Sequence, residues 1–167
     1  IARRQQVALA LTAVLAGGAA CQAQHHQAAS KAGPPAPARG FTLVASGDVL
    51  PHSSIIDRAR FDGGGNAYDF RPMLAGVKPV VSHADLALCH METVYGANGD
   101  YTGYPTFKSP PEVAQGLAAT GYDGCSTASN HTLDDGAEGI RRTLDALDAV
   151  GVRHAGSART EAEAHTV

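Results

Sequence analysis

Short apolar segments that alternate with helix-like segments place the strongest constraint on the fold of this chain. Each apolar segment is short enough to be a buried strand and ends next to glycine or polar residues. These predicted strands are residues 41–46, 85–91, 122–129 and 152–155. Strands that alternate with helices predict an α/β fold with a largely parallel sheet.

The predicted helices lie between these strands. Residues 137–150 form the clearest one, and its apolar face is made by Ile140, Leu144, Leu147 and Val150. Pro110 and Pro111 open another helix, which Gly121 closes. Residues 71–83 have helical character that Pro79 breaks. Residues 95–111 lack a helical period and predict a long loop of the kind that borders functional sites.

The N-terminal segment predicts export. In residues 1–23, Arg3 and Arg4 precede an apolar run that ends in small residues and Cys21, which is the order of parts in a secretory signal peptide. The run is too short to span a bilayer comfortably. Two outcomes stay open: lipidation of Cys21, as in a bacterial lipoprotein, or simple cleavage nearby. Residues 24–40 are rich in Ala, Pro and Gln and predict a linker.

The charge of the remaining chain argues against a nucleic-acid partner. Residues 41–167 carry 9 Lys and Arg against 16 Asp and Glu, a net charge of −7. Binding to a phosphate backbone depends on basic residues that neutralise phosphates, and no basic patch remains in this part of the sequence.

Polar residues with ligand chemistry follow three of the predicted strands. Asp48 follows the first strand, Glu92 the second, and Asn130 with His131 the third. The carboxyl ends of parallel strands meet at one edge of a sheet, where α/β proteins bind ligands. Each residue alone could be a cap or a turn former, but together they are the ligand types that divalent cations prefer.

Three motifs in this order resemble the CapA family, which is named for poly-γ-glutamate capsule biosynthesis. They are GDVL at residues 47–50, HMET at 90–93 and SNHTLDDG at 129–136, and TLDALDAVGVRHAG at 143–156 fits the same pattern. The family is similar to the calcineurin-like metallophosphoesterases. The resemblance implies a sandwich of mixed sheets flanked by helices, of which residues 41–167 would be the N-terminal part, truncated at the C-terminus.

The resemblance also implies roles for individual residues. Asp48, Glu92 and Asn130 would bind divalent metal ions, two of them, drawn from Mn, Fe, Zn or Mg, and Glu92 could bridge the two. His131 would stabilise charge or protonate the leaving group. At the position of His90 the family more often has asparagine. His90 would at most support the metal ligands without binding the metal itself. His52 follows Asp48 by four residues and could face the same site.

The implied function is that of an exported, extracytoplasmic protein of the bacterial cell envelope. It would be a metal-dependent hydrolase or transferase that acts on an anionic polymer or phosphoester, either secreted or held at the membrane by lipid on Cys21, and working with a membrane synthase complex. Relatives supply further histidines from later motifs, which are missing after His131. The alternatives are a non-catalytic envelope protein that binds or helps export an anionic polymer, and a solute-binding lipoprotein.

Two further groups of residues have competing interpretations. Cys89 and Cys125 lie within predicted strands, and we expect buried free thiols rather than a disulfide, although exported proteins can pair such cysteines. The loop at residues 95–111 carries aromatic side chains and a lysine that either face a substrate or pack against the sheet. These residues are Tyr95, Tyr101, Tyr104, Phe107 and Lys108.

We expect the mature protein in its native host either to lack residues 1 to about 23 or to carry lipid on Cys21, because the basic, apolar and small-residue segments occur in export order. Mass spectrometry of the mature N-terminus checks this expectation. A cytosolic protein that retains Arg3 and Arg4 would contradict it.

Overall fold

A computed structural model describes residues 40–166 of the chain. The predicted signal segment at residues 1–23, Cys21 and nearly all of the predicted linker at 24–40 lie outside the described residues. Within the described residues, no helix is both long and apolar enough to cross a membrane.

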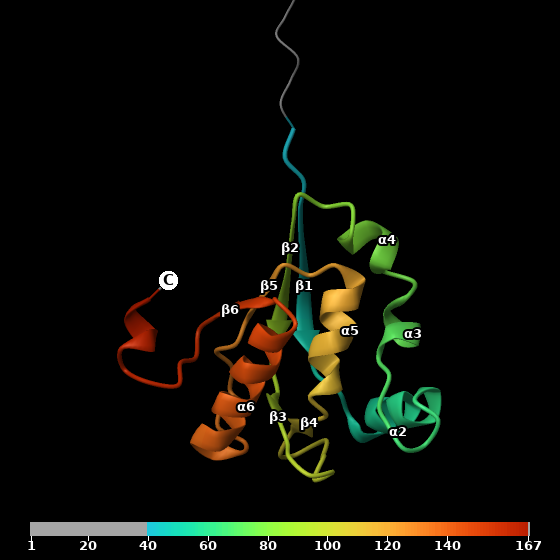
Figure 1. Cartoon of the computed structure of the whole chain (residues 1–167), viewed down its shortest axis with the longest axis vertical. Helices are drawn as coiled ribbons and strands as arrows, with labels where there is room; N and C mark the ends of the chain where they lie inside the picture. The colour runs from blue at the N-terminus through green and yellow to red at the C-terminus, as the bar shows by residue number, and fades with distance from the viewer. Residues whose placement is uncertain (1–39, 167) are drawn as a thin grey trace, which may run out of the picture. The chain divides into compact units, whose positions relative to one another are not determined.

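A four-stranded parallel sheet organises the described residues (Figure 1). Its strands follow the order β1-β2-β5-β6, and each neighbouring pair is parallel. The strands are β1 (Leu43–Val49), β2 (Leu86–Met91), β5 (Gly124–Ser126) and β6 (Arg153–Ala155). With its flanking helices, this sheet confirms the predicted α/β fold and is consistent with the N-terminal part of a metallophosphoesterase-like fold.

Two helices lie side by side across one face of the sheet (Figure 1). They are α5 (Glu112–Thr120) and α6 (Gly136–Ala149). Gly121 ends α5 with a φ of 107°, a left-handed conformation that favours glycine. Helix α6 buries Leu144 and Leu147 completely, as its apolar spacing predicts, while Ile140 and Val150 are half-buried.

Three further helices connect β1 to β2. They are α2 (Ser53–Asp62), α3 (Arg71–Leu74) and α4 (Lys78–Val81). The helical stretch predicted at residues 71–83 is interrupted, but at residues 75–77 rather than at Pro79, which lies in the first turn of α4, where proline is tolerated. Helix α2 was not predicted from the sequence, because it buries only Ile56 and Ala59 and therefore has a weak apolar period.

The two faces of the sheet differ in burial. In β2, Ala87, Cys89 and Met91 are buried and belong to the core, whereas Leu88 is 36% exposed on the opposite face. Leu43 of β1 is also 54% exposed. Alternating residues of a strand point to opposite faces, so the helices cover one face and the other face is exposed in the described part of the chain.

Strand β1 is longer than the predicted segment and includes Asp48. Its pairing with β2 shifts register between Ala45 and Asp48, so β1 accommodates one extra residue there. Gly47 and the small residues around it allow this bulge. Asp48 therefore lies within the end of the strand rather than after it, with His90 as its register partner.

Cys89 and Cys125 form a disulfide, so the expectation of free thiols was wrong. The physical reason is the register: the two residues are partners on adjacent strands β2 and β5, and their Cα atoms lie 4.4 Å apart. Disulfides require Cα atoms within about 7 Å, and register cannot be read from sequence spacing.

The predicted loop at residues 95–111 contains two short strands. They are β3 (Val94–Tyr95) and β4 (Lys108–Ser109), which pair in parallel. Near the end of the described residues, η1 (Glu163–His165) is a single 3₁₀ turn, and the Glu163 N–H donates to the Thr160 hydroxyl over 3.1 Å.

We expect the double variant Cys89→Ala/Cys125→Ala of the exported protein to lose about 2–4 kcal/mol of unfolding free energy, because the disulfide closes a long loop of the unfolded chain. Denaturant unfolding measures the loss. Peptide mapping should also yield a linked peptide containing Cys89 and Cys125 that disappears on reduction; alkylation of both thiols without reduction would contradict the disulfide.

Candidate functional site

The predicted site residues lie at the carboxyl ends of the strands. Asp48 is the next-to-last residue of β1, Glu92 follows β2 directly, and Asn130 and His131 lie in the loop between β5 and α6. The arrows of β1 and β2 point to the same end of the sheet at which α6 begins and β3 and β4 lie (Figure 1). The topology therefore brings these segments to one end of the molecule.

Glu92 has a buried oxygen that lacks a hydrogen-bond partner within residues 40–166: its Oε2 atom. Its neighbour Thr93 is buried and shares a hydrogen bond of 2.7 Å with the Ser109 hydroxyl, which anchors the start of the segment to β4. A buried carboxylate oxygen without a partner is costly, and a cation would satisfy it.

Glu112 is the other residue of the described part with such an oxygen. It is the first residue of α5, where the free N–H groups of the helix favour a negative charge. The N-terminus of α5 therefore explains how the negative charge of Glu112 is stabilised. No comparable group among the described residues stabilises the charge of Glu92 at its strand end.

Hydroxyl groups fix the loop that carries Asn130. The Ser129 N–H donates to the Thr132 hydroxyl over 2.7 Å, and that hydroxyl donates to the Thr127 carbonyl over 3.0 Å. The Ser129 hydroxyl donates to Asn130 Oδ1 over 3.0 Å and accepts the His131 N–H over 3.3 Å. Asn130 is exposed. The loop is thus held by its own side chains, and the Asn130 amide faces solvent.

Two neighbouring residues, Asp134 and Phe107, hold the imidazole ring of His131 in place. Its Nδ1 lies 2.7 Å from Asp134 Oδ2, and because a carboxylate only accepts, Nδ1 donates this hydrogen bond. The same Asp134 oxygen accepts the Phe107 N–H over 2.7 Å. The Phe107 ring meets the His131 ring edge-on, with centroids 4.7 Å apart. Asp134 and Phe107 therefore fix the imidazole, whose Nε2 has no hydrogen-bond partner among residues 40–166.

His52 contacts the same aromatic side chain. Its ring centroid lies 4.9 Å from that of Phe107, in an edge-on arrangement. His52 precedes α2 as its N-cap residue and is exposed. His52 and His131 therefore flank Phe107, which places His52 at the edge of the site that the sequence suggested.

The described residues do not form a closed metal-ligand cluster. Across residues 40–166, no three His, Cys, Asp or Glu side chains converge closely enough to hold an ion. Asp48 is exposed, and no hydrogen bond joins Asp48, Glu92 and Asn130 to one another in this part of the chain. The structure gathers their segments at one end of the sheet without hydrogen bonds between these side chains in the described residues.

The structure places His90, which the family resemblance put behind the metal ligands, beside Asp48. The two are register partners on β1 and β2. His90 Nδ1 also lies 2.6 Å from the Ser126 hydroxyl of β5, its register partner on the other side. Only the register reveals this row of Asp48, His90 and Ser126, because the three residues are far apart in sequence.

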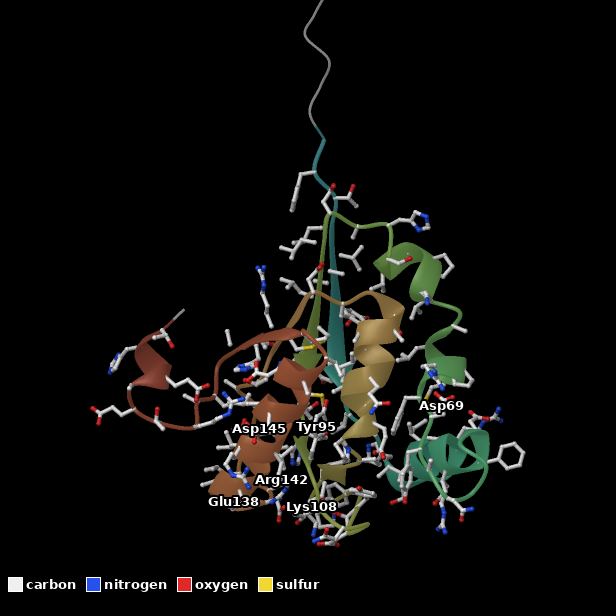
Figure 2. All side chains as sticks on the ribbon, viewed as in Figure 1. Asp69, Tyr95, Lys108, Glu138, Arg142 and Asp145 are labelled. Carbon is white, nitrogen blue, oxygen red and sulfur yellow. A yellow bond between two sulfur atoms is a disulfide. The ribbon has the colours of Figure 1, made fainter. Side chains whose placement is uncertain are left out.

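The aromatic side chains of the loop at residues 95–111 differ in their burial. Tyr95 is fully buried under α6, where Arg142 donates to its carbonyl over 3.1 Å (Figure 2). Burial raises the pKa of the Tyr95 phenol far above its usual range, so this side chain stays neutral. Phe107 is also buried, whereas Tyr104 is exposed.

Lys108 and Tyr101 of this loop lie close to acidic side chains. Lys108, labelled in Figure 2, forms an ion pair with Asp100. Partial burial, together with the negative charge of Glu112, raises the pKa of Tyr101. An anionic group that approached Lys108 would therefore compete with the Asp100 carboxylate, which already forms an ion pair with it.

Comparisons with known proteins agree with these features. Residues 42–167 match the family described as bacterial capsule synthesis protein PGA_cap. Two proteins of Sinorhizobium fredii, uncharacterized protein y4uA and uncharacterized protein y4sH, are each 33% identical to this chain over 132 residues. Each alignment covers 75% of this chain and 26% of the relative, so the chain spans about a quarter of the length of these curated relatives.

We expect Asp134→Ala to lower the free energy of unfolding by about 1–3 kcal/mol, because it leaves the Phe107 N–H and His131 Nδ1 without their acceptor. Denaturant unfolding of the full-length protein measures this loss. Asp57→Ala is the matched control: this exposed carboxylate of α2 makes no hydrogen bond within the described residues, and the change should stay within about 0.5 kcal/mol. Equal stability of the two variants would contradict the role of Asp134.

Proposed function

The chain belongs to the bacterial capsule synthesis protein family, and on that premise we propose that the full-length protein is an exported, metal-dependent hydrolase or transferase of capsule or poly-γ-glutamate metabolism. Its substrate would be an anionic polymer or a phosphoester. It would act beside a membrane synthase complex, and lipid on Cys21 would hold it at the outer face of the membrane.

The observation that carries the proposal is the buried, unpartnered Oε2 of Glu92 at the carboxyl end of β2. Asp48 at the end of β1 and the Asn130 amide at the start of the next loop supply further oxygens at the same end of the sheet. These donors fit a hard or borderline divalent cation, so Asp48, Glu92 and Asn130 would hold it. When bound, such an ion stabilises negative charge that develops on a phosphoester or amide oxygen.

His131 would handle the proton of the leaving group. Asp134 accepts the hydrogen bond from Nδ1 and so fixes the ring, which leaves Nε2 to exchange a proton with the substrate. Phe107 packs against the ring edge and limits its rotation. The histidine is thus positioned before substrate binds, which lowers the entropic cost of proton transfer.

The Cys89–Cys125 disulfide supports the proposed export. Disulfides persist in oxidising compartments outside the cytoplasm and are rare in reducing ones. The order of segments in residues 1–23 points in the same direction.

We expect the full-length protein to bind a divalent metal that the triple variant Asp48→Ala/Glu92→Ala/Asn130→Ala does not retain. Glu92→Gln alone should weaken binding, because the amide keeps the shape of the side chain but removes its charge. Glu112→Gln is the matched control, since among residues 40–166 Glu112 is the other residue with a buried, unpartnered carboxylate oxygen, and removal of its charge should leave the metal content unchanged. Elemental analysis after dialysis decides the outcome, and unchanged stoichiometry in the triple variant would reject the site.

We expect His131→Ala to keep its metal and to reduce turnover by about 10² to 10⁴, the usual contribution of a general acid. His131→Asn should be almost as slow, since it retains polarity but cannot deliver a proton. Turnover of a phosphoester or polymer substrate and a thermal melt are measured together. Wild-type turnover in a variant with normal metal content and a normal melting curve would remove His131 from the mechanism and favour a non-catalytic polymer-binding protein.

A further inference from the structure

Two large apolar side chains are exposed on the two loops that meet at His131. Tyr104 lies in the loop between β3 and β4 and is 79% exposed. Leu133 lies in the loop between β5 and α6 and is 71% exposed. Single exposed apolar residues are common on protein surfaces, but two of them on adjoining loops at a candidate site indicate a surface that contacts a ligand.

Phe107 joins the two loops. Its N–H donates to Asp134, the residue directly after Leu133, over 2.7 Å. Its ring packs edge-on against His131, two residues before Leu133. Tyr104 precedes Phe107 by three residues in the same tight loop. Both exposed side chains therefore lie within three residues of the contact that holds the His131 ring.

Backbone contacts fix the loop that presents Tyr104. Thr102 and Lys108 exchange two backbone hydrogen bonds of 2.9 and 3.0 Å, which close the segment between them. Gly103 packs so tightly against the start of α2 that a Cβ atom there would lie 2.7 Å from the Ser53 nitrogen. A side chain on a fixed loop loses little conformational entropy when it binds a ligand.

Leu133 borders a hollow beside the Asn130 amide. The two residues line a depression of about 400 Å³, whose walls also include Ile140 of α6 and Ser157, which follows β6. All the residues that line it are uncharged. The depression therefore has room for an uncharged part of a ligand next to Asn130.

The charge of the chain determines which kind of contact can hold an anionic polymer here. Residues 41–167 carry a net charge of −7, which repels a polyanion. Lys108, at the base of the Tyr104 loop, is already paired with Asp100. Binding must therefore draw on the uncharged parts of the polymer, such as methylene groups, which pack well against an aromatic ring or a leucine.

From these observations we infer that Tyr104 and Leu133 form an uncharged binding surface beside His131 for an extended polymer, and that they determine specificity for a polymer over a small phosphoester. The inference rests on the proposed function, because it names the substrate class of the same site. Neither side chain has a group that takes part in proton transfer or hydrolysis at neutral pH. Their contribution is to binding.

Kinetics of the full-length, metal-loaded protein with two probes, poly-γ-glutamate and p-nitrophenyl phosphate, test the inference. Tyr104→Ala should raise KM for poly-γ-glutamate by about 2- to 10-fold and leave kcat unchanged, because it removes contacts that the bound substrate and the transition state share. Leu133→Ala should act in the same direction. Both variants should leave the kinetics of p-nitrophenyl phosphate unchanged, since this probe is too small to extend over both loops. Tyr104→Phe should behave like the wild type because it keeps the ring.

Two pairs of variants separate the position of Tyr104 from general effects. Gly103→Ala keeps the tyrosine but forces its loop away from Ser53, and should also raise KM for poly-γ-glutamate. Its control is Gly76→Ala, where an added Cβ meets no atom within 4 Å. Phe61→Ala is the control for Tyr104→Ala: this phenylalanine is 76% exposed at the other end of α2 from Ser53, and its loss should change neither substrate's kinetics.

The outcomes distinguish this inference from the proposed function. If the protein hydrolyses p-nitrophenyl phosphate while Tyr104→Ala and Leu133→Ala keep the wild-type KM for poly-γ-glutamate, the inference is overturned and the proposed function stands. If neither probe is turned over, the proposed function is overturned, and calorimetric titration with poly-γ-glutamate then tests the surface alone. Weaker binding by Tyr104→Ala in that titration supports the surface, and wild-type affinity or no binding by the wild type overturns it.

Thermal melts test whether another part of the full-length protein covers these side chains. Tyr104→Ala and Leu133→Ala should melt as Phe61→Ala does, because exposed side chains contribute little to stability. A clearly lower melting temperature in these two variants alone would show that Tyr104 and Leu133 are packed inside the full-length protein, and would overturn the inference.

Discussion

The pairing of β2 with β1 on one side and with β5 on the other is the interaction on which the rest of this structure depends. The strands are all parallel, so their carboxyl ends must meet at one end of the sheet, and each connection must return along the helical layer. This geometry places Asp48, Glu92 and the loop of Asn130 at the same end, although more than 80 residues separate the first from the last. The disulfide between Cys89 and Cys125 reinforces the pairing at its centre.

Local sequence patterns were sufficient to predict the elements with strong signals. Helix α6 has a clear apolar face, and Gly121 provides the left-handed residue that ends α5, so both were predicted to within a residue or two. The strands were predicted from their apolar runs. Helix α2 was missed because it buries only two side chains, and its sequence therefore has little amphipathic character.

The features that the sequence did not reveal all depend on register or on contacts between distant residues. The bulge in β1 sets which residue of β2 lies beside Asp48, and no local pattern specifies a bulge of this kind. The register of β2 with β5 decides that Cys89 meets Cys125 and that His90 meets Ser126. Asp134 was part of a recognised motif, but its contact with the Phe107 N–H comes from the folding of the loop at residues 95–111 against it.

The polar groups at this end of the sheet fall into two kinds, which have different physical consequences. Asp134 Oδ2 and the hydroxyls of Ser129 and Thr132 each form hydrogen bonds with neighbouring protein groups, and these bonds hold the loop between β5 and α6. Asp48 is exposed, and one oxygen of Glu92 has no partner within the described residues, so both groups stay available to a ligand. A buried carboxylate oxygen without a partner costs stability. Binding of a cation would recover that cost, which couples ligand binding at this end of the sheet to the stability of the fold itself.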